Sequence, residues 1–258
     1  MGKESNHWYD KTGKAAYTTL DSKGKERSTN LRDARKHGYV PSVTTILGVA
    51  AKPSLENWKV NQAINAALAL EKRKGETDTQ FLYRCKEYSR SVGKEAAEKG
   101  TIIHAMIEQG FEGGEETKPY IKIKEYLDKK FPNEKWTSEA SFCAEDGYGG
   151  KIDLHSESGI FVDFKTKDNL SGKEGARLVF DEHGMQLSAY ANGCGFDSPE
   201  RVSIFVDRED TGLIVPYKWD KDTHPRHLAM FKSLLTYWKL LKKYDSSKSI
   251  GDSNAAAA

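Results

Sequence analysis

Residues 150–167 read GKIDLHSESGIFVDFKTK, and this stretch decides the fold class. The apolar run that begins at Ile160 predicts a largely buried strand. Just before it, Ser156–Gly159 has the small and polar residues of a tight turn. The stretch therefore predicts a β-hairpin with one strand on each side of this turn.

The predicted hairpin brings two carboxylates together. A turn centred after Glu157 places Asp153 close to opposite Asp163 in antiparallel pairing. Lys165 shares a face with Asp163, because side chains alternate along a strand. Like charges that face each other on a sheet are unfavourable, and a divalent cation bound by both carboxylates would compensate them. The alternative is a solvated strand face with a surface ion pair, but this strand is too apolar to lie open.

Composition limits the class of protein. The 258 residues are enough for one large domain or two small ones, with 37% hydrophobic and 30% charged residues. A formal charge of +2 neither indicates nor excludes a nucleic-acid partner. No apolar run reaches the roughly 20 residues of a membrane span, and the first residues lack the apolar core of a secretory signal. Three isolated cysteines argue against a disulfide framework, a zinc site and a four-cysteine iron–sulfur cluster. We therefore expect a cytoplasmic protein without a membrane partner.

Periodicity and turn residues predict a mixed α/β fold. A short hairpin is expected within residues 7–31, and strands at 136–144, 149–155, 160–165, 201–207 and 212–218. Helices are expected from Ser42 and at residues 53–74, 77–111 with a break near 91–93, 120–131, 181–192 and 227–244. We expect a central mixed sheet flanked by helices, with a helical N-terminal portion. The expected organisation is a single domain over residues 1–258, with an N-terminal portion 1–135, a core 136–245 and a disordered tail 246–258.

Two helical segments carry polar pairs at a spacing of one turn. In EKGTIIHAMIEQG, residues 98–110, His104 and Glu108 share a face, and Gly100 lies one turn earlier. Glycine costs about 1 kcal/mol relative to alanine inside a helix, so Gly100 suggests close approach of a backbone or a ligand. The alternative is a helix packed through its isoleucines, with His104 at the edge of the packed face.

The second pair is Gln186 and Tyr190 in HGMQLSAYANG, residues 183–193. An amide and a phenol on one helix face can hold a nucleophilic water, a phosphate oxygen or a base. The alternative is a core-facing helix in which the Tyr190 hydroxyl bonds to the backbone. Taken alone, this pair favours the core-facing interpretation.

The four pieces occur in a characteristic order. They are Gly-x-x-x-His, Gly-x-x-Asp, Asp-x-Lys and Gln-x-x-x-Tyr, at Gly100/His104, Gly150/Asp153, Asp163/Lys165 and Gln186/Tyr190. This order resembles the RecB-like branch of the PD-(D/E)XK nucleases. The segment PSVTTILGVAAKPSLENWK, residues 41–59, is also similar to the N-terminal segment of the mitochondrial single-strand exonuclease and of phage-encoded exonucleases of this branch. The proline that can open the Pro-Asp motif is absent here, and YGGKID stands in its place.

The resemblance implies a restriction-endonuclease-like core and a metal site. Its ligands would be His104, Asp153, Asp163 and the main-chain carbonyl of Phe164, binding Mg²⁺ or Mn²⁺. No iron–sulfur cluster is expected, because this chain lacks the four cysteines that some members carry. Lys165 would stabilise the charge that develops on the phosphate or orient the attacking water.

Further residues follow from the same resemblance. Gln186 and Tyr190 would position the nucleophile or the nucleic-acid backbone. Glu139 matches an acidic position of several members and is equally consistent with an exposed strand carboxylate; Glu108 is a further candidate. The candidate DNA contacts are Ser42, Thr44, Thr45, Trp58, Lys59, Lys151 and Lys167. Trp58 could stack on a base, or could simply be a core residue of an amphipathic helix.

The segment RCKEYSRSVGKEAAEKG, residues 84–100, is rich in basic residues. It could guide a phosphate backbone toward His104 and border a passage that admits only a single strand. The alternative is a solvated helix face whose cations are balanced by Glu87, Glu95 and Glu98.

The resemblance implies a metal-dependent DNA exonuclease that prefers single-stranded or end-containing DNA and acts in recombination, repair or replication. A phage-encoded member would work in the cytoplasm of its bacterial host. One alternative is a structure-selective or nicking endonuclease with the same residues. Another is a catalytically inactive DNA-binding module, against which the intact Asp153, Asp163 and Lys165 argue. A hydrolase of another phosphoester is a third, although no nucleotide-binding loop is visible.

Overall fold

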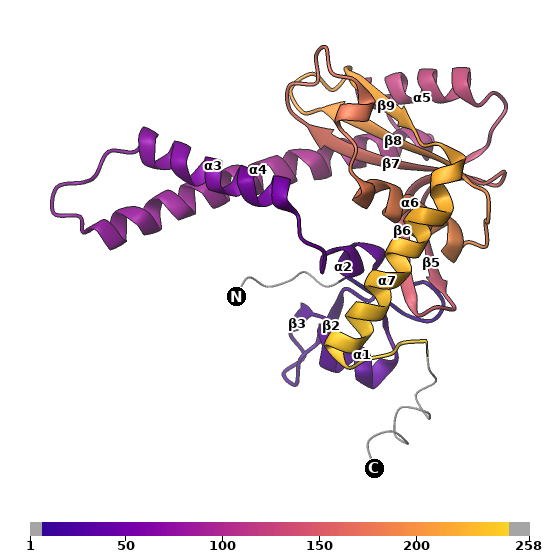
Figure 1. Cartoon of the computed structure of the whole chain (residues 1–258), viewed down its shortest axis with the longest axis horizontal. Coiled ribbons are helices and arrows are strands. Elements are labelled where there is room, and N and C mark those ends of the chain that lie inside the picture. Colours follow the sequence, from indigo (N-terminus) through magenta and orange to yellow (C-terminus); the bar gives the residue numbers. More distant parts are fainter. Residues whose placement is uncertain (1–6, 248–258) are drawn as a thin grey trace. The chain divides into compact units, whose positions relative to one another are not determined.

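The computed structural model describes residues 7–247, and Figure 1 shows its helices and strands. The chain forms two compact units. Ala50–Ala105 make the smaller unit, and the segments on either side of it, to Val49 and from Met106, make the larger one. The single domain expected over residues 1–258 stays a prediction.

A five-stranded mixed sheet forms the centre of the larger unit (Figure 1). In spatial order its strands are β5 (Trp136–Ala144), β6 (Tyr148–Ser156), β7 (Ile160–Lys167), β8 (Glu200–Asp207) and β9 (Ile214–Lys218). Strands β7 and β8 run parallel, and the other neighbours are antiparallel. A parallel pair needs a crossover, which contains α6 (Asp181–Gly193). The structure thus confirms a mixed sheet flanked by helices.

Helices cover the sheet because its central strands are apolar throughout. Every residue of β8 except Glu200 is buried, as is expected for a strand covered on both faces. Helix α6 packs across β5 to β8, and α7 (His224–Lys242) packs on α6. Helix α5 (Lys118–Lys130) buries Ile123 and Leu127 and contacts β9. The catalytic candidates of β6, β7 and α6 therefore lie on rigid elements of one core.

Short elements at the N-terminus complete the larger unit. The predicted hairpin is formed by β2 (Thr18–Leu20) and β3 (Glu26–Ser28), and β1 (Trp8–Tyr9) pairs with β4 (Val40–Pro41). Helix α1 (Leu31–His37), which the sequence analysis did not predict, begins with a reciprocal capping box between Asn30 and Asp33. Helix α2 (Val43–Leu47) begins after Ser42, as predicted.

The smaller unit contains α3 (Pro53–Ala69) and most of α4 (Asp78–Phe111). The predicted break near residues 91–93 is wrong, because α4 is one continuous helix of 34 residues. Gly93 remains helical, and the indole ring of Trp58 packs close to it. The extension of α3 to residue 74 was also wrong, since the helix ends at Ala69.

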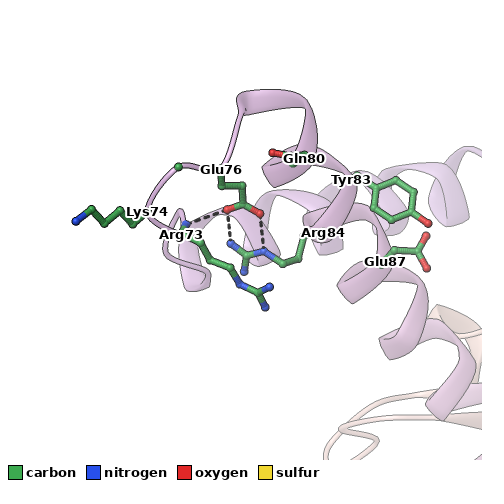
Figure 2. A pocket seen from close by; sticks show the side chains of 8 residues that line it. Arg73, Lys74, Glu76, Gln80, Tyr83, Arg84 and Glu87 are labelled. Carbon is green, nitrogen blue, oxygen red and sulfur yellow. Dashed lines mark hydrogen bonds and ion pairs between the residues drawn. The ribbon is translucent and has the colours of Figure 1, made fainter.

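The segment between α3 and α4 is closed by an ion pair. Glu76 accepts two hydrogen bonds from Arg84, of 2.8 and 3.0 Å, and one from the Arg73 amide (Figure 2). Arg84 also donates to the Glu71 carbonyl at 2.7 Å. Arg84 thus stabilises this turn of the chain.

The remaining strand predictions lie within two residues of the observed bounds. Ser246, which the sequence analysis assigned to a disordered tail, is buried, and its hydroxyl donates to the Gly147 carbonyl at 2.5 Å. Residues 248–258 of that tail lie outside the described residues. Among residues 7–247, no helix combines the length and apolar character that a membrane span requires.

Candidate active site

The site begins where the pairing of β6 and β7 ends. The register joins Leu154 to Val162 and His155 to Phe161, so that Asp153 and Asp163 come next and stand opposite each other. Here a side chain takes the place of a backbone acceptor in the hydrogen bonding between the strands: the backbone amide of Phe164 donates to Asp153 Oδ2 at 2.8 Å. The predicted hairpin and the facing carboxylates are both present.

Lys165 and Gln186 surround the Asp163 carboxylate. The Lys165 ammonium lies 2.8 Å from Oδ1 and 2.6 Å from Oδ2 of Asp163. Gln186, from α6, donates from Nε2 to Asp163 Oδ1 at 2.8 Å and accepts from Lys165 at its Oε1 at 3.2 Å. Asp163 is buried, whereas the side chain of Lys165 is 29% exposed, so Lys165 is the member of this pair that an external group can approach.

Tyr190 closes the network behind Gln186. Its hydroxyl accepts from Gln186 Nε2 at 2.9 Å, and the side chain is buried. The ring lies against the backbone of Gly150, where an added Cβ would come within 2.8 Å of a ring carbon. The Gly-x-x-Asp and Gln-x-x-x-Tyr motifs therefore meet directly, and the glycine is required for that contact.

Electrostatics couples the charged groups. Burial raises the pKa of Asp163, Lys165 lowers it, and Asp153 raises it further, with a net upward shift. Burial favours a lower pKa for Lys165, but the carboxylates of Asp163 and Asp153 outweigh it and raise the value. Burial followed by the same two carboxylates raises the pKa of Tyr190, which remains a neutral phenol. The arrangement is a pair of carboxylates held beside a charged ammonium.

The donor set of this site suits a hard divalent cation. Two carboxylates and a nearby main-chain carbonyl are oxygen ligands, and Mg²⁺ commonly takes only one or two carboxylates and keeps several waters. Within residues 7–247, no three or more His, Cys, Asp or Glu side chains are grouped so that they could bind a metal ion together. His104 belongs to the smaller unit, so its ligation, like the metal itself, stays a prediction.

Glu139 lies on the neighbouring strand β5. The residues on both sides of it pair regularly with β6, which places Glu139 opposite Asp153. Its backbone φ is 55°, a left-handed conformation that is unusual for glutamate. Its carboxylate forms an ion pair with Lys151. Strain of this kind, typically about 1–3 kcal/mol, clusters at functional sites, so it favours a role in the site over an ordinary exposed carboxylate.

The predicted DNA contacts of the larger unit differ in how exposed their side chains are. Ser42 is buried and its hydroxyl accepts from the Thr45 amide at 3.0 Å, which makes it a helix cap rather than an accessible contact. Thr44 is exposed and Thr45 half-buried. Lys151 is exposed but paired with Glu139, and Glu108 is half-buried near the end of α4.

The two predicted DNA contacts of the smaller unit, Trp58 and Lys59, line one pocket. Trp58, Lys59, Lys86 and Arg90 are among the residues that line a cavity of about 330 Å³ between α3 and α4. Trp58 is 38% exposed, so it is not a core residue. A second, more open pocket of about 540 Å³ lies at Arg73 and Arg84 (Figure 2).

Several cations of the basic segment have acidic partners on α4. Arg90 pairs with Glu87, Lys94 with Glu98 at 3.4 Å, and Lys99 with Glu95 at 3.6 Å. Arg84 is held by Glu76. The pairs along α4 favour the interpretation of a balanced, solvated helix face for Arg90, Lys94 and Lys99, whereas Arg84 is held by a partner from outside the helix.

A buried arginine fixes helix α6 on the sheet. Arg201 of β8 is fully buried and donates to Ser188 Oγ at 2.7 Å and to the Gly184 carbonyl at 3.4 Å. Its other arm donates to the Asp220 carbonyl at 2.9 Å and to Thr223 Oγ1 at 2.8 Å. Burial lowers its pKa to about 10. The guanidinium therefore ties α6 to the segment that leads into α7.

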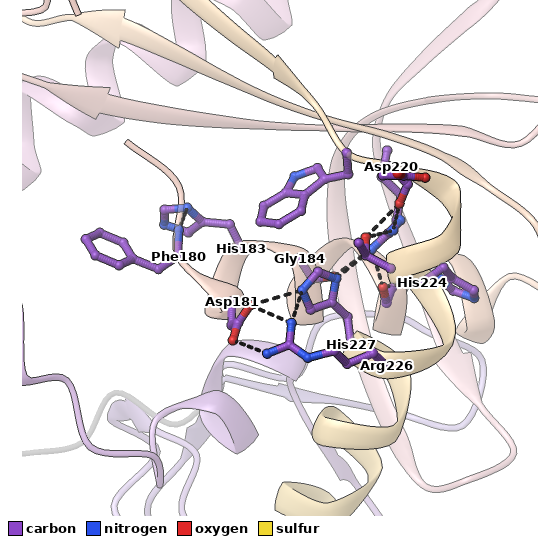
Figure 3. Close-up of polar contacts among 12 residues, drawn as sticks. Phe180, Asp181, His183, Gly184, Asp220, His224, Arg226 and His227 are labelled. Carbon is purple, nitrogen blue, oxygen red and sulfur yellow. Dashed lines mark hydrogen bonds and ion pairs between the residues drawn. The ribbon is translucent and has the colours of Figure 1, made fainter. Parts of the chain in front are cut away.

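Two histidines of α7 extend this network (Figure 3). His227 Nδ1 lies 3.1 Å from the Arg201 guanidinium, and its Nε2 lies 3.2 Å from Asp181 at the start of α6. The His227 ring occupies the space that a side chain at Gly184 would take. His224 Nδ1 lies 3.1 Å from Ser188 Oγ. Gln186 and Tyr190 are thus positioned by contacts on the opposite side of their helix.

The sequence analysis missed Arg201 and also His183. His183 lies one turn before Gln186 on α6, and its charge lowers the pKa of Asp163 after the larger effects of burial and its neighbours. The spacing of His183, Gln186 and Tyr190 at i, i+3 and i+7 was a usable signal. For Arg201 the sequence contains no such signal, because an arginine at the start of an apolar strand is usually exposed.

Comparisons with known proteins add little to this site. No family model and no curated protein matches the chain. Among solved structures, SSO0001 is similar with 15% identity, covering 70% of this chain and 85% of that one, at a TM-score of 0.30. An alkaline exonuclease from Laribacter hongkongensis is similar with 13% identity, covering 71% of this chain and 96% of that one, also at 0.30. At these TM-scores neither similarity supports a conclusion, so the function rests on the residues of the site.

Proposed function

We propose that this chain is a metal-dependent nuclease of the RecB-like PD-(D/E)XK type that hydrolyses phosphodiester bonds in DNA. One observation carries the proposal: Asp153 and Asp163 face each other where their strands stop pairing, with Lys165 held against Asp163 by Gln186. Burying the Asp163 carboxylate with the half-buried Asp153 beside it is costly, and Lys165 is the cation that the structure places against Asp163. A substrate phosphate and a divalent cation would both complement it.

Each residue then has a chemical role. Asp153, Asp163 and the Phe164 carbonyl would hold Mg²⁺ or Mn²⁺, with His104 as a further ligand. Bound there, such an ion makes water more acidic and neutralises phosphate charge. Lys165 donates from its ammonium to a phosphate oxygen as negative charge develops. Gln186 and Tyr190 orient the Lys165–Asp163 pair, and Glu139 adds negative charge beside Asp153.

We further propose that the enzyme is an exonuclease on single-stranded or end-containing DNA, in recombination, repair or replication. A nicking or structure-selective endonuclease would use the same residues. The two activities are therefore distinguished by the form of DNA that is cleaved. The connected network of Asp163, Lys165 and Gln186 favours an active enzyme over an inactive DNA-binding module.

The test is digestion of linear and circular single-stranded DNA of one sequence, with Mg²⁺, Mn²⁺ or EDTA. An exonuclease removes nucleotides from the linear strand only, and only when the metal is present. Cleavage of the circular strand would show that the enzyme is an endonuclease and not an exonuclease. Absence of cleavage of either strand with both metals would contradict a nuclease function.

A further inference from the structure

Lys167 occupies an unusual position beside the proposed active site. It lies on the same face of β7 as Asp163 and Lys165, about 7 Å along the strand from Lys165. Its ammonium donates to the Leu178 carbonyl at 3.1 Å. In the part of the chain that the structure describes, no carboxylate forms an ion pair with it. A half-buried cation in this place is therefore available to an anion.

Two phenylalanine rings flank this ammonium. It lies 5.1 Å from the ring centroid of Phe180 and 5.2 Å from that of Phe205. Phe205 is fully buried, whereas Phe180 is 48% exposed at the start of α6. Figure 3 shows the Phe180 side chain extending away from the helix, beside His183. Since Lys167 lies over one face of the Phe180 ring, the exposure of that ring leaves apolar aromatic surface open beside a cation.

The local charge favours an anionic ligand. Burial lowers the pKa of Lys167, and the nearby charges of Lys173 and Arg208 lower it further. Arg208 is compensated by Asp168, with contacts of 2.5 and 2.6 Å. The remaining positive charge lies on Lys167 and Lys173, next to a site that would receive a phosphate.

We infer that Phe180 and Lys167 form a subsite for one nucleotide of a single strand, next to the phosphate that is cleaved. The nucleobase stacks on the open surface of Phe180, and its phosphate contacts the Lys167 ammonium. Aromatic stacking accepts any base and lysine accepts any phosphate, so the subsite selects an unpaired strand without selecting its sequence. A base within a duplex has no free face for this contact. This inference rests on the proposed nuclease function.

The test measures binding of a fluorescein-labelled oligothymidylate by anisotropy in EDTA, with an oligonucleotide of the same length made of abasic sites as the second probe. Phe180→Ala should weaken binding of the oligothymidylate about tenfold and leave binding of the abasic strand unchanged. Phe180→Trp should restore the lost affinity. Tyr237→Ala is the matched control, because Tyr237 is 53% exposed on α7, and it should change neither affinity.

Lys167→Met should weaken both probes and reduce the slope of log affinity against log salt by about 0.7, the value for one phosphate on a single strand. Equal weakening of both probes by Phe180→Ala, or no weakening of either, would overturn the subsite. The proposed function fails separately: a wild-type chain that neither binds nor cuts DNA contradicts both proposals, whereas a wild-type chain that cuts DNA while Phe180→Ala binds normally contradicts the subsite alone.

Discussion

Gln186 is the residue whose replacement tests the network most sharply. Its amide joins three groups: it donates to Asp163 at 2.8 Å and to Tyr190 at 2.9 Å, and accepts from Lys165 at 3.2 Å. Gln186→Leu keeps the side chain's approximate size in a position that is only 7% exposed, and removes all three contacts. The Asp163 oxygen and the Tyr190 hydroxyl then lose a buried partner.

Leaving buried polar atoms without a partner costs about 1–3 kcal/mol, so urea unfolding should show a loss of that size. The single-turnover rate of DNA cleavage should fall about tenfold to a hundredfold, the usual effect of removing a group that orients a metal ligand. Asn192→Leu is the matched control. It removes an amide from the same helix, where Asn192 donates to the Tyr148 hydroxyl at 2.8 Å. It should destabilise the fold by a similar amount and leave the rate per folded molecule unchanged. Equal rates for the two variants would refute the assigned role of Gln186.

Three further predictions follow from the same structure. Glu139→Gly relieves a left-handed backbone, so the free energy of unfolding should stay constant or rise by about 1 kcal/mol, while cleavage falls; unchanged cleavage would make Glu139 structural. Burial lowers the pKa of His224 to about 4, below the ordinary 6.5, so the unfolded state binds more protons. The stability that this group contributes is complete above about pH 6.5 and is lost as the pH falls toward 4, by about 3 kcal/mol in total. In His224→Asn, the free energy of unfolding measured in urea should therefore depend less on pH between 6.5 and 4. Arg201→Met should lower the cleavage rate through the position of α6 but leave the concentration of Mn²⁺ at half-maximal rate unchanged; a shift in that concentration would place Arg201 in the metal site.

The strands and the central pair of carboxylates were predictable because their signals are local. Alternation and the Ser156–Gly159 turn fix which residues of the hairpin face each other. The observed pairing of Leu154 with Val162, continued by one residue, places Asp153 opposite Asp163. The capping box of α1, at Asn30 and Asp33, was a readable local signal that the sequence analysis did not use.

Other features depend on contacts between distant parts of the chain. Periodicity shows that α3 has an apolar face but not whether anything covers it, and Leu68 is in fact 81% exposed. The left-handed conformation of Glu139 and the burial of Arg201 arise from tertiary packing, for which no local pattern exists. Likewise, the contact of Tyr190 with Gly150 joins two motifs 40 residues apart, and only the fold shows that they touch.

We propose that the Asp163 carboxylate serves the hydrolysis of DNA rather than the stability of the fold. The test compares Asp163→Asn with Asp207→Asn, since Asp207 is also buried but accepts from the backbone amides of Leu170, Glu209 and Asp210. With linear single-stranded DNA and Mn²⁺, Asp163→Asn should lower the cleavage rate about a hundredfold or more without loss of thermal stability. Asp207→Asn should lower stability and retain the rate of the folded protein. Near-normal cleavage by Asp163→Asn would contradict a catalytic role for Asp163.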